Sequence, residues 1–185
     1  MSDRLDGRVI VVGVTGGIAA YKAVTLVSRL RQLGAEVHVV MTPAATRFVS
    51  AATFRAVSQH PVITDLWDPA SPYDEPHVAL GERAALYVIA PATAHTIARL
   101  ALGLADDAVS ATALATRAPL IVAPAMHDAM YEHPATQAHL RTLRERGCHL
   151  VGPETGWLAS GKTGIGRMAE PDAIIDEICA VLAAR

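Results

Sequence analysis

The sequence predicts a doubly wound α/β fold, a parallel sheet of Rossmann-like, flavodoxin type with helices on both faces. Short β-branched runs alternate with stretches of helical periodicity along the whole chain. The runs are apolar at nearly every position, which is typical of parallel strands buried on both sides. Neither a linker nor an internal repeat interrupts the alternation, so residues 1–185 are predicted to form a single domain.

The first βαβ unit is the clearest. Its strand, glycine-containing turn, helix and second strand are predicted at residues 8–14, 15–17, 18–33 and 37–41. Gly34 follows the helical pattern and provides a C-terminal stop.

The remaining elements follow in the same alternation. Three more strands are predicted at residues 84–90, 119–123 and 148–151. Further helices are predicted to start at Pro43 and to cover residues 50–58, 77–83, 94–102, 106–115, 134–146 and 171–184. Residues 59–76 and the glycine-rich residues 153–168 are predicted to be loops, and long loops in compact domains are often functional.

Composition excludes several classes of protein. Sixteen basic and 18 acidic residues give a net charge of −2, without the basic run that binds nucleic acid. The apolar runs are too short to span a bilayer, and the N-terminus lacks a secretory signal. Cys148 and Cys179 are far apart, which favours two free thiols in a reducing compartment. We therefore expect a cytoplasmic protein with neither nucleic-acid nor membrane partners.

Two segments at the ends of strands indicate a ligand site. Residues 124–130, Pro-Ala-Met-His-Asp-Ala-Met, follow a buried strand, and open α/β sheets bind ligands at that edge. The turn at Gly16-Gly17 suits a phosphate at a helix N-terminus. It is not a GxGxxG motif, and no acidic residue ends the second strand, so a mononucleotide is favoured over NAD. A turn that merely requires glycine is the alternative.

Residues 156–163 match the GxxxxGK[ST] pattern of nucleoside triphosphatases. That mechanism needs a strand running directly into a helix, but two more glycines follow at once and disfavour a helix start. We therefore interpret the segment as a mobile glycine-rich flap.

The eight histidines contain neither an HxxxH nor an HExxH pair, so no metal site is expected. His77 and His127 lie on loops at the expected ligand edge and are the candidates for chemistry. His38, in a strand, and His60 are interpreted as structural or solvated.

Five segments together resemble a known family. They are residues 14–22, 90–94, 103–107, 124–130 and 161–168. The chain resembles the homo-oligomeric flavin-containing cysteine decarboxylases, in particular the phosphopantothenoylcysteine decarboxylase domain of coenzyme A biosynthesis. A sister branch makes aminovinyl-cysteine groups in peptides.

The resemblance implies that FMN is the cofactor and that flavin lies at a subunit boundary of a homotrimer or homododecamer. It implies cofactor-binding roles for Gly16, Gly17, Ile18, Thr42, Ala92, Thr93, Ala94, Asp107 and Ala125. His95 replaces an Asn or Asp that the family usually carries after these alanines.

The resemblance also implies that His77 is the catalytic base and anchor. It implies substrate contacts from Met126, His127, Met130, Ala159, Arg167 and Met168. Two positions depart from the family pattern. His127 replaces an Asn that holds the substrate, and Ser160 replaces the flap Cys that protonates an enethiol, although serine is a far weaker acid.

The implied reaction is oxidative decarboxylation of (R)-4′-phospho-N-pantothenoylcysteine to 4′-phosphopantetheine. Because Ser160 replaces the cysteine, release of an enethiol from a peptidyl cysteine is the alternative. A non-catalytic FMN-binding partner protein is a second alternative. Bacterial coenzyme A proteins usually fuse this domain to a synthetase, so a fused or separate synthetase domain is an expected partner.

Overall fold

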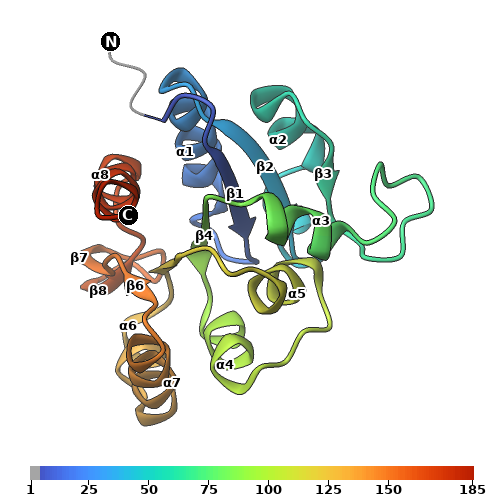
Figure 1. Ribbon diagram of the computed structural model, residues 1–185. Helices are drawn as coiled ribbons and strands as arrows, with labels where there is room; N and C mark the ends of the chain where they lie inside the picture. The colour runs from blue at the N-terminus through green and yellow to red at the C-terminus, as the bar shows by residue number, and fades with distance from the viewer. Residues whose placement is uncertain (1–4) are drawn as a thin grey trace.

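A parallel sheet of six strands organises the computed structural model, which describes residues 5–185 (Figure 1). The strand order within this range is β3-β2-β1-β4-β5-β6, and every neighbouring pair is parallel. The strands are β1 (Val9–Val14), β2 (Glu36–Met41), β3 (Val62–Ile63), β4 (Leu86–Ala92), β5 (Leu120–Pro124) and β6 (His149–Leu150). The predicted doubly wound fold is confirmed.

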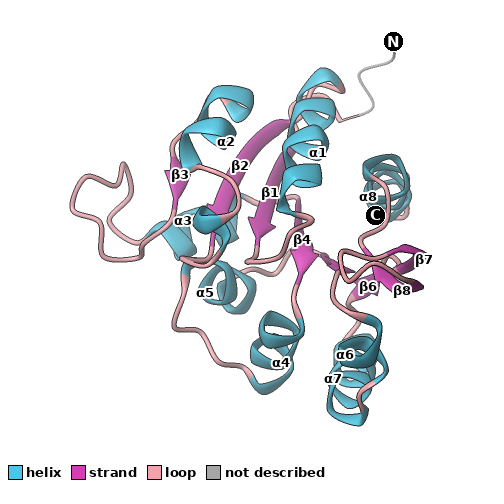
Figure 2. Cartoon of the chain, turned by 180° about the vertical axis from the view of Figure 1, so that it is seen from behind, coloured by secondary structure: helices cyan, strands magenta, loops and turns pink. Residues whose placement is uncertain are grey.

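Helices cover both faces of this sheet (Figures 1 and 2). One face packs against α1 (Ala20–Gln32), α2 (Ala51–Ser58) and α8 (Pro171–Ala183). The other packs against α3 (Pro76–Arg83), α4 (Ala94–Leu102), α5 (Ala108–Ala115) and α7 (Pro134–Glu145). Side chains alternate along β1, where Ile10 and Val12 enter the first core and Val11 the second. All three are fully buried, which explains why the strand is apolar throughout.

Two predicted loops contain strands. Val62 and Ile63 form the short edge strand β3 within predicted loop 59–76, and residues 64–75 extend from the body as a loop (Figure 1). The loop prediction for 153–168 was wrong, because β7 (Glu154–Trp157) and β8 (Thr163–Arg167) form an antiparallel hairpin. Its glycines lower the intrinsic strand preference, and cross-strand pairing overrides them.

Several element boundaries also differ. The helix predicted to start at Pro43 is a single 3-10 turn, η1 (Ala45–Arg47). A short helix not predicted, α6 (Asp128–Glu132), follows β5. The triphosphatase-like motif at 156–163 spans the β7–β8 hairpin rather than a strand-to-helix turn, consistent with rejecting that function. No helix among residues 5–185 is long and apolar enough to cross a bilayer.

A buried tyrosine fixes the packing between β1, β4 and α5. Tyr87 is fully buried, and its hydroxyl donates to the Val109 carbonyl at 2.9 Å. Burial raises the pKa of Tyr87 well above its ordinary value, so the hydroxyl stays protonated. A Cβ at Gly13 would lie 2.6 Å from this hydroxyl oxygen. Position 13 therefore has room for glycine but not for a side chain.

We expect Gly13→Ala to destabilise the fold by about 1–3 kcal/mol, because the added methyl overpacks the core. Urea unfolding of the whole chain measures the change. The penalty should shrink in a Tyr87→Phe background, which removes the opposing hydroxyl. Gly17→Ala is the matched control, since its Cβ would meet nothing closer than 3.6 Å. Equal penalties at the two glycines would contradict the packing argument.

Candidate functional site

The central strands β1 and β4 leave a crevice at their carboxyl ends. They are neighbours in the sheet, but the chain leaves β1 for α1 on one face and β4 for α4 on the other (Figure 2). Such a switch point is where open α/β sheets bind ligands. The N-termini of α1 and α4 both border this crevice.

A single hydroxyl ties the two strand ends together. Thr15 is fully buried, and its Oγ1 donates to the Pro91 carbonyl at 2.7 Å. The same oxygen accepts a hydrogen bond from the Thr93 amide at 3.1 Å. The Thr93 side chain in turn accepts from the Thr96 amide and caps α4. The Gly16-Gly17 turn and the start of α4 are thereby held side by side.

The crevice encloses a cavity of about 410 Å³. Its walls come from the first turn, the start of α4, the loop after β5 and the β7–β8 hairpin. A second pocket, lined also by Thr42 and Asp107, shares Gly16, Thr93, Ala94 and Met130 with it. The two form one continuous site, of a size that suits a cofactor.

Most of the residues singled out from the sequence line these two pockets. The expected cofactor residues there are Gly16, Gly17, Ile18, Thr42, Thr93, Ala94, Asp107 and Ala125. The expected substrate and proton-donor residues there are Met126, His127, Met130, Ala159, Ser160, Arg167 and Met168. Ala92 is instead buried at the end of β4, behind Thr93.

His77 lines neither pocket. It lies in the first turn of α3, a helix that packs against α5 and β1. Its Nδ1 is buried and has no hydrogen-bond partner among residues 5–185. Buried polar atoms are almost always paired, because leaving one unpaired costs about 1–3 kcal/mol. The hydrogen-bonding capacity of His77 Nδ1 is therefore not met by protein atoms within residues 5–185.

Known flavoproteins are similar to this chain in sequence and in fold. The sequence model of the family named Flavoprotein matches residues 1–183. The chain belongs to the flavoprotein family.

One curated relative of this flavoprotein is the coenzyme A biosynthesis bifunctional protein CoaBC of Haemophilus influenzae. It is 48% identical over 171 residues, which cover 92% of this chain and 43% of the relative. The flavoprotein thus spans less than half the length of that protein.

Two solved structures have the same fold over nearly their whole length. A Cys-to-Ser mutant of PPC decarboxylase complexed with pantothenoylaminoethenethiol has a TM-score of 0.82 and 32% identity, covering 93% of this chain and 96% of that one. The FMN-dependent cysteine decarboxylase SpaF has a TM-score of 0.81 and 33% identity, covering 98% of each chain. The predicted family is confirmed.

Two cations of the flavoprotein share one carboxylate beside the cavity. Lys22 Nζ lies 2.6 Å and Arg167 Nη2 2.8 Å from Glu170 Oε1. Lys22 chiefly holds the pKa of Glu170 below its usual range, so the carboxylate is charged at neutral pH. Lys22 and Arg167 line the cavity and the glutamate does not, so this wall presents cations, which suits an anionic ligand. Lys22 was not predicted as a site residue; it lies in the first turn of α1 and lines the cavity together with Ile18.

The hairpin closes one side of the cavity and is attached at both its base and its tip. At the base, the Met126 amide donates to the Gly166 carbonyl at 3.0 Å. A Cβ at Gly166 would lie only 2.0 Å from the Met126 carbonyl oxygen, so glycine is required there. Near the tip, Lys162 Nζ pairs with Asp128 Oδ2 at 2.8 Å.

The sequence does not reveal this closure, because the segment reads as a loop. Trp157 and Leu158 of the hairpin also line the cavity and were not singled out as site residues. Their contribution becomes visible only once strand pairing places them over the crevice.

We expect Asp128→Asn to loosen the hairpin, because it removes the charge that Lys162 pairs with. Amide exchange in β7 and β8 should rise about two- to fivefold, as is typical of an exposed ion pair. Asp172→Asn is the matched control, since it breaks the exposed pair with Arg29 outside the hairpin. Unchanged exchange in Asp128→Asn would show that the pair does not restrain the hairpin.

The Asp128–Lys162 ion pair makes the stability of the hairpin depend on pH. Lys162 holds the pKa of Asp128 below its ordinary value. The ion pair therefore stabilises the hairpin fully above the ordinary pKa of an aspartate. This stabilisation is lost as the pH falls through the lowered pKa of Asp128. The rate of limited proteolysis within the hairpin should stay constant from neutral to mildly acidic pH and rise only below that range. A rise near pH 6–7 would contradict this assignment.

Proposed function

We propose that the chain binds FMN in the crevice and oxidatively decarboxylates a terminal cysteine. The proposed substrate is (R)-4′-phospho-N-pantothenoylcysteine and the product 4′-phosphopantetheine. The observation that carries the proposal is the cavity at the switch point, which gathers all but two of the residues expected from the cysteine decarboxylases. Similarity to CoaBC and to PPC decarboxylase supports this choice of substrate.

The residues present fit FMN. The amides of Ile18 and Ala19, just before α1, have no backbone partner among residues 5–185, and helix N-termini favour phosphate. Met126 and Met130 offer an apolar surface for a flat ring. When bound, FMN would accept two electrons from the cysteine and return them to the enethiol, so the net change to the saturated thiol is loss of CO₂ alone; the protein would supply placement.

We infer that His77 acts in the cavity of a neighbouring copy of the chain. Its unpaired Nδ1 and its distance from the cavity support a site completed by a second protomer. Large apolar side chains are exposed on several helices, as a self-association surface requires. A homotrimer, alone or stacked into a dodecamer, is the proposed assembly. In it His77 would anchor the substrate carboxylate and move a proton.

His127 would hold the substrate in place of the family's asparagine. His127 Nδ1 lies 2.9 Å from Asp128 Oδ1, to which it donates, so Nε2 is left for the substrate. Nε2 accepts a hydrogen bond in the neutral ring and donates one to a carbonyl or carboxylate when the ring is protonated. Lys22 and Arg167 provide the cationic wall for the substrate's anionic groups.

Ser160 favours a second candidate function. It lies exposed at the hairpin tip and lines the cavity, but a hydroxyl is a poor proton donor compared with a thiol. Without that proton the reaction would stop at an enethiol, as in the proposed peptide-modifying alternative, and an external acceptor such as O₂ would take the two electrons left on the flavin. Similarity to SpaF and to a Cys-to-Ser mutant bound to an aminoethenethiol supports this candidate.

The proposal extends to partners and location. CoaBC is named as bifunctional, and the chain matches 43% of it. A synthetase, fused or separate, is therefore the proposed partner, because it would supply the cysteine conjugate. The free thiols of Cys148 and Cys179 support a reducing, cytoplasmic setting.

We expect purified protein to show the absorbance of oxidised flavin and to turn over phosphopantothenoylcysteine with loss of CO₂. His77→Asn should keep its flavin and lose decarboxylation by about 10²- to 10⁴-fold, the usual contribution of an acid–base group. His139→Asn, on the outer helix α7, is the matched control. Protein that neither carries nor binds FMN would overturn the proposal.

Mixed oligomers test whether His77 acts across a boundary. His77→Asn and His127→Ala, each expected to be inactive alone, should regain measurable activity when co-assembled. Some sites then receive both wild-type residues from different protomers. Absence of rescue in verified mixed oligomers would place both residues in one protomer's site.

Product analysis distinguishes the two candidate reactions. Loss of CO₂ alone corresponds to the saturated thiol, and loss of CO₂ with two hydrogens corresponds to the enethiol. We expect Ser160→Cys to shift the product towards the saturated thiol, because a thiol is the stronger acid. Ser28→Cys on α1 controls for an added thiol. No shift in Ser160→Cys would remove position 160 from the proton-donor role.

A further inference from the structure

A second group of chemistry-bearing side chains lies at the opposite end of the sheet from the crevice. Glu36 and His38 are two residues apart at the amino end of β2, so their side chains share one face. His60 lies two residues before β3, which pairs in parallel with β2 through Val39 and Val62. Strand pairing thus brings His60 beside the other two.

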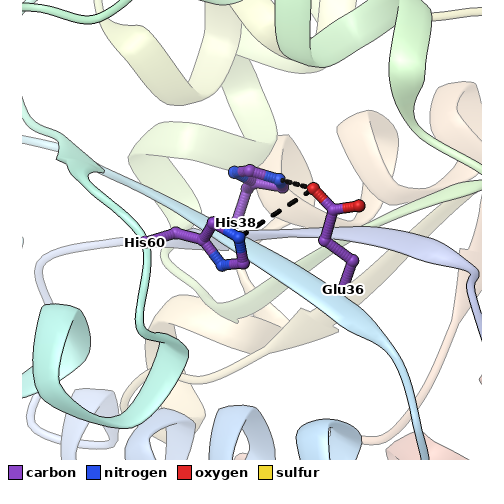
Figure 3. A group of neighbouring side chains, drawn as sticks. All are labelled: Glu36, His38 and His60. Atoms are coloured by element: carbon purple, nitrogen blue, oxygen red, sulfur yellow. Dashed lines mark hydrogen bonds and ion pairs between the residues drawn. The ribbon is translucent and has the colours of Figure 1, made fainter.

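The three side chains converge on one point (Figure 3). His38 Nε2 lies 2.7 Å and His60 Nε2 3.9 Å from Glu36 Oε1. All three atoms lie within 4.8 Å of one another, and the ring centroids are 4.4 Å apart. Ligand atoms about 2.0–2.1 Å from a tetrahedral zinc ion lie about 3.3 Å apart. Shifts of roughly an ångström would therefore give coordination distances.

A neighbouring carbonyl orients one of the rings. His60 Nδ1 lies 3.0 Å from the Ser58 carbonyl oxygen, to which it donates in the neutral ring. The His60 amide also donates to Ser58 Oγ at 3.2 Å. This arrangement leaves the lone pair on Nε2, directed at Glu36. Metal-binding histidines are usually oriented by such a second hydrogen bond.

We propose that Glu36 Oε1, His38 Nε2 and His60 Nε2 form a zinc site. Two imidazole nitrogens and one carboxylate oxygen are a ligand set that Zn²⁺ favours. Glu36 and His60 are each about one-third exposed, so water can reach the fourth position. A bound ion would fasten the two-residue edge strand β3 to β2.

Arg83 competes for the same carboxylate. From the last turn of α3, its Nη2 lies 2.6 Å from Glu36 Oε1. The Arg83 side chain is 44% exposed, so its guanidinium can turn into solvent. A cation entering the site must displace it and is repelled by its charge. Arg83 therefore lowers the affinity of the site, and its removal raises it.

Titration of chelator-treated whole protein with Zn²⁺, followed by calorimetry, tests the site. We expect one equivalent to bind, His60→Ala to weaken binding at least tenfold, and Arg83→Gln to strengthen it severalfold. His149→Ala is the matched control, because His149 pairs with a single carboxylate, Glu177, at 2.9 Å. The His149→Ala variant should bind Zn²⁺ with the affinity of the wild type. Thermal unfolding without zinc verifies that each variant is folded.

Cobalt gives an independent readout, because tetrahedral Co²⁺ absorbs visible light. We expect that band in the wild type and in Arg83→Gln, and its loss in His60→Ala. Two results would overturn the proposal. One is no binding even in Arg83→Gln, and the other is equal binding by His60→Ala and His149→Ala. In either case the cluster is a hydrogen-bonded network that only links β2 to β3 and α3.

Discussion

The crevice depends on the hydroxyl of Thr15. β1 and β4 pair as far as Gly13 and Ile89, and the chain then continues from β1 to α1 on one face and from β4 to α4 on the other. Thr15 Oγ1 joins them by bonding Pro91 and Thr93 while fully buried. The position of the glycine turn relative to α4, and so the shape of the cavity floor, follows from that one bridge.

Much of the fold was predictable because its signals are local. The apolar run of β1, the glycine stop at Gly34 and the helical spacing between them need no tertiary information. The β7–β8 hairpin was not predictable, because its glycines resemble a loop and its strands form only through pairing with each other. β3 was missed for a similar reason, since two residues are too few to carry a periodic pattern.

Some residues of the candidate site could be predicted from the sequence and others could not, for similar reasons. Residues within motifs, such as Gly16, Thr93 and Met126, were found because strand ends of a parallel sheet meet at one edge. The placement of His77 outside the cavity could not be read from its motif, because it depends on where α3 packs. The cluster of Glu36, His38 and His60 has no sequence signature, because parallel pairing of β3 rather than helical spacing brings His60 close.

The hairpin that closes the cavity is attached to the rest of the protein by several polar contacts. A two-stranded hairpin is marginally stable alone, and this one makes the Met126–Gly166 hydrogen bond, the Asp128–Lys162 pair and the bond from the Glu170 amide to Glu154. Because the hairpin forms a separate sheet, it can open locally at less than the free energy needed to unfold the main sheet. Opening would widen the crevice, and the tip sequence can tune how often it occurs without altering the cavity floor.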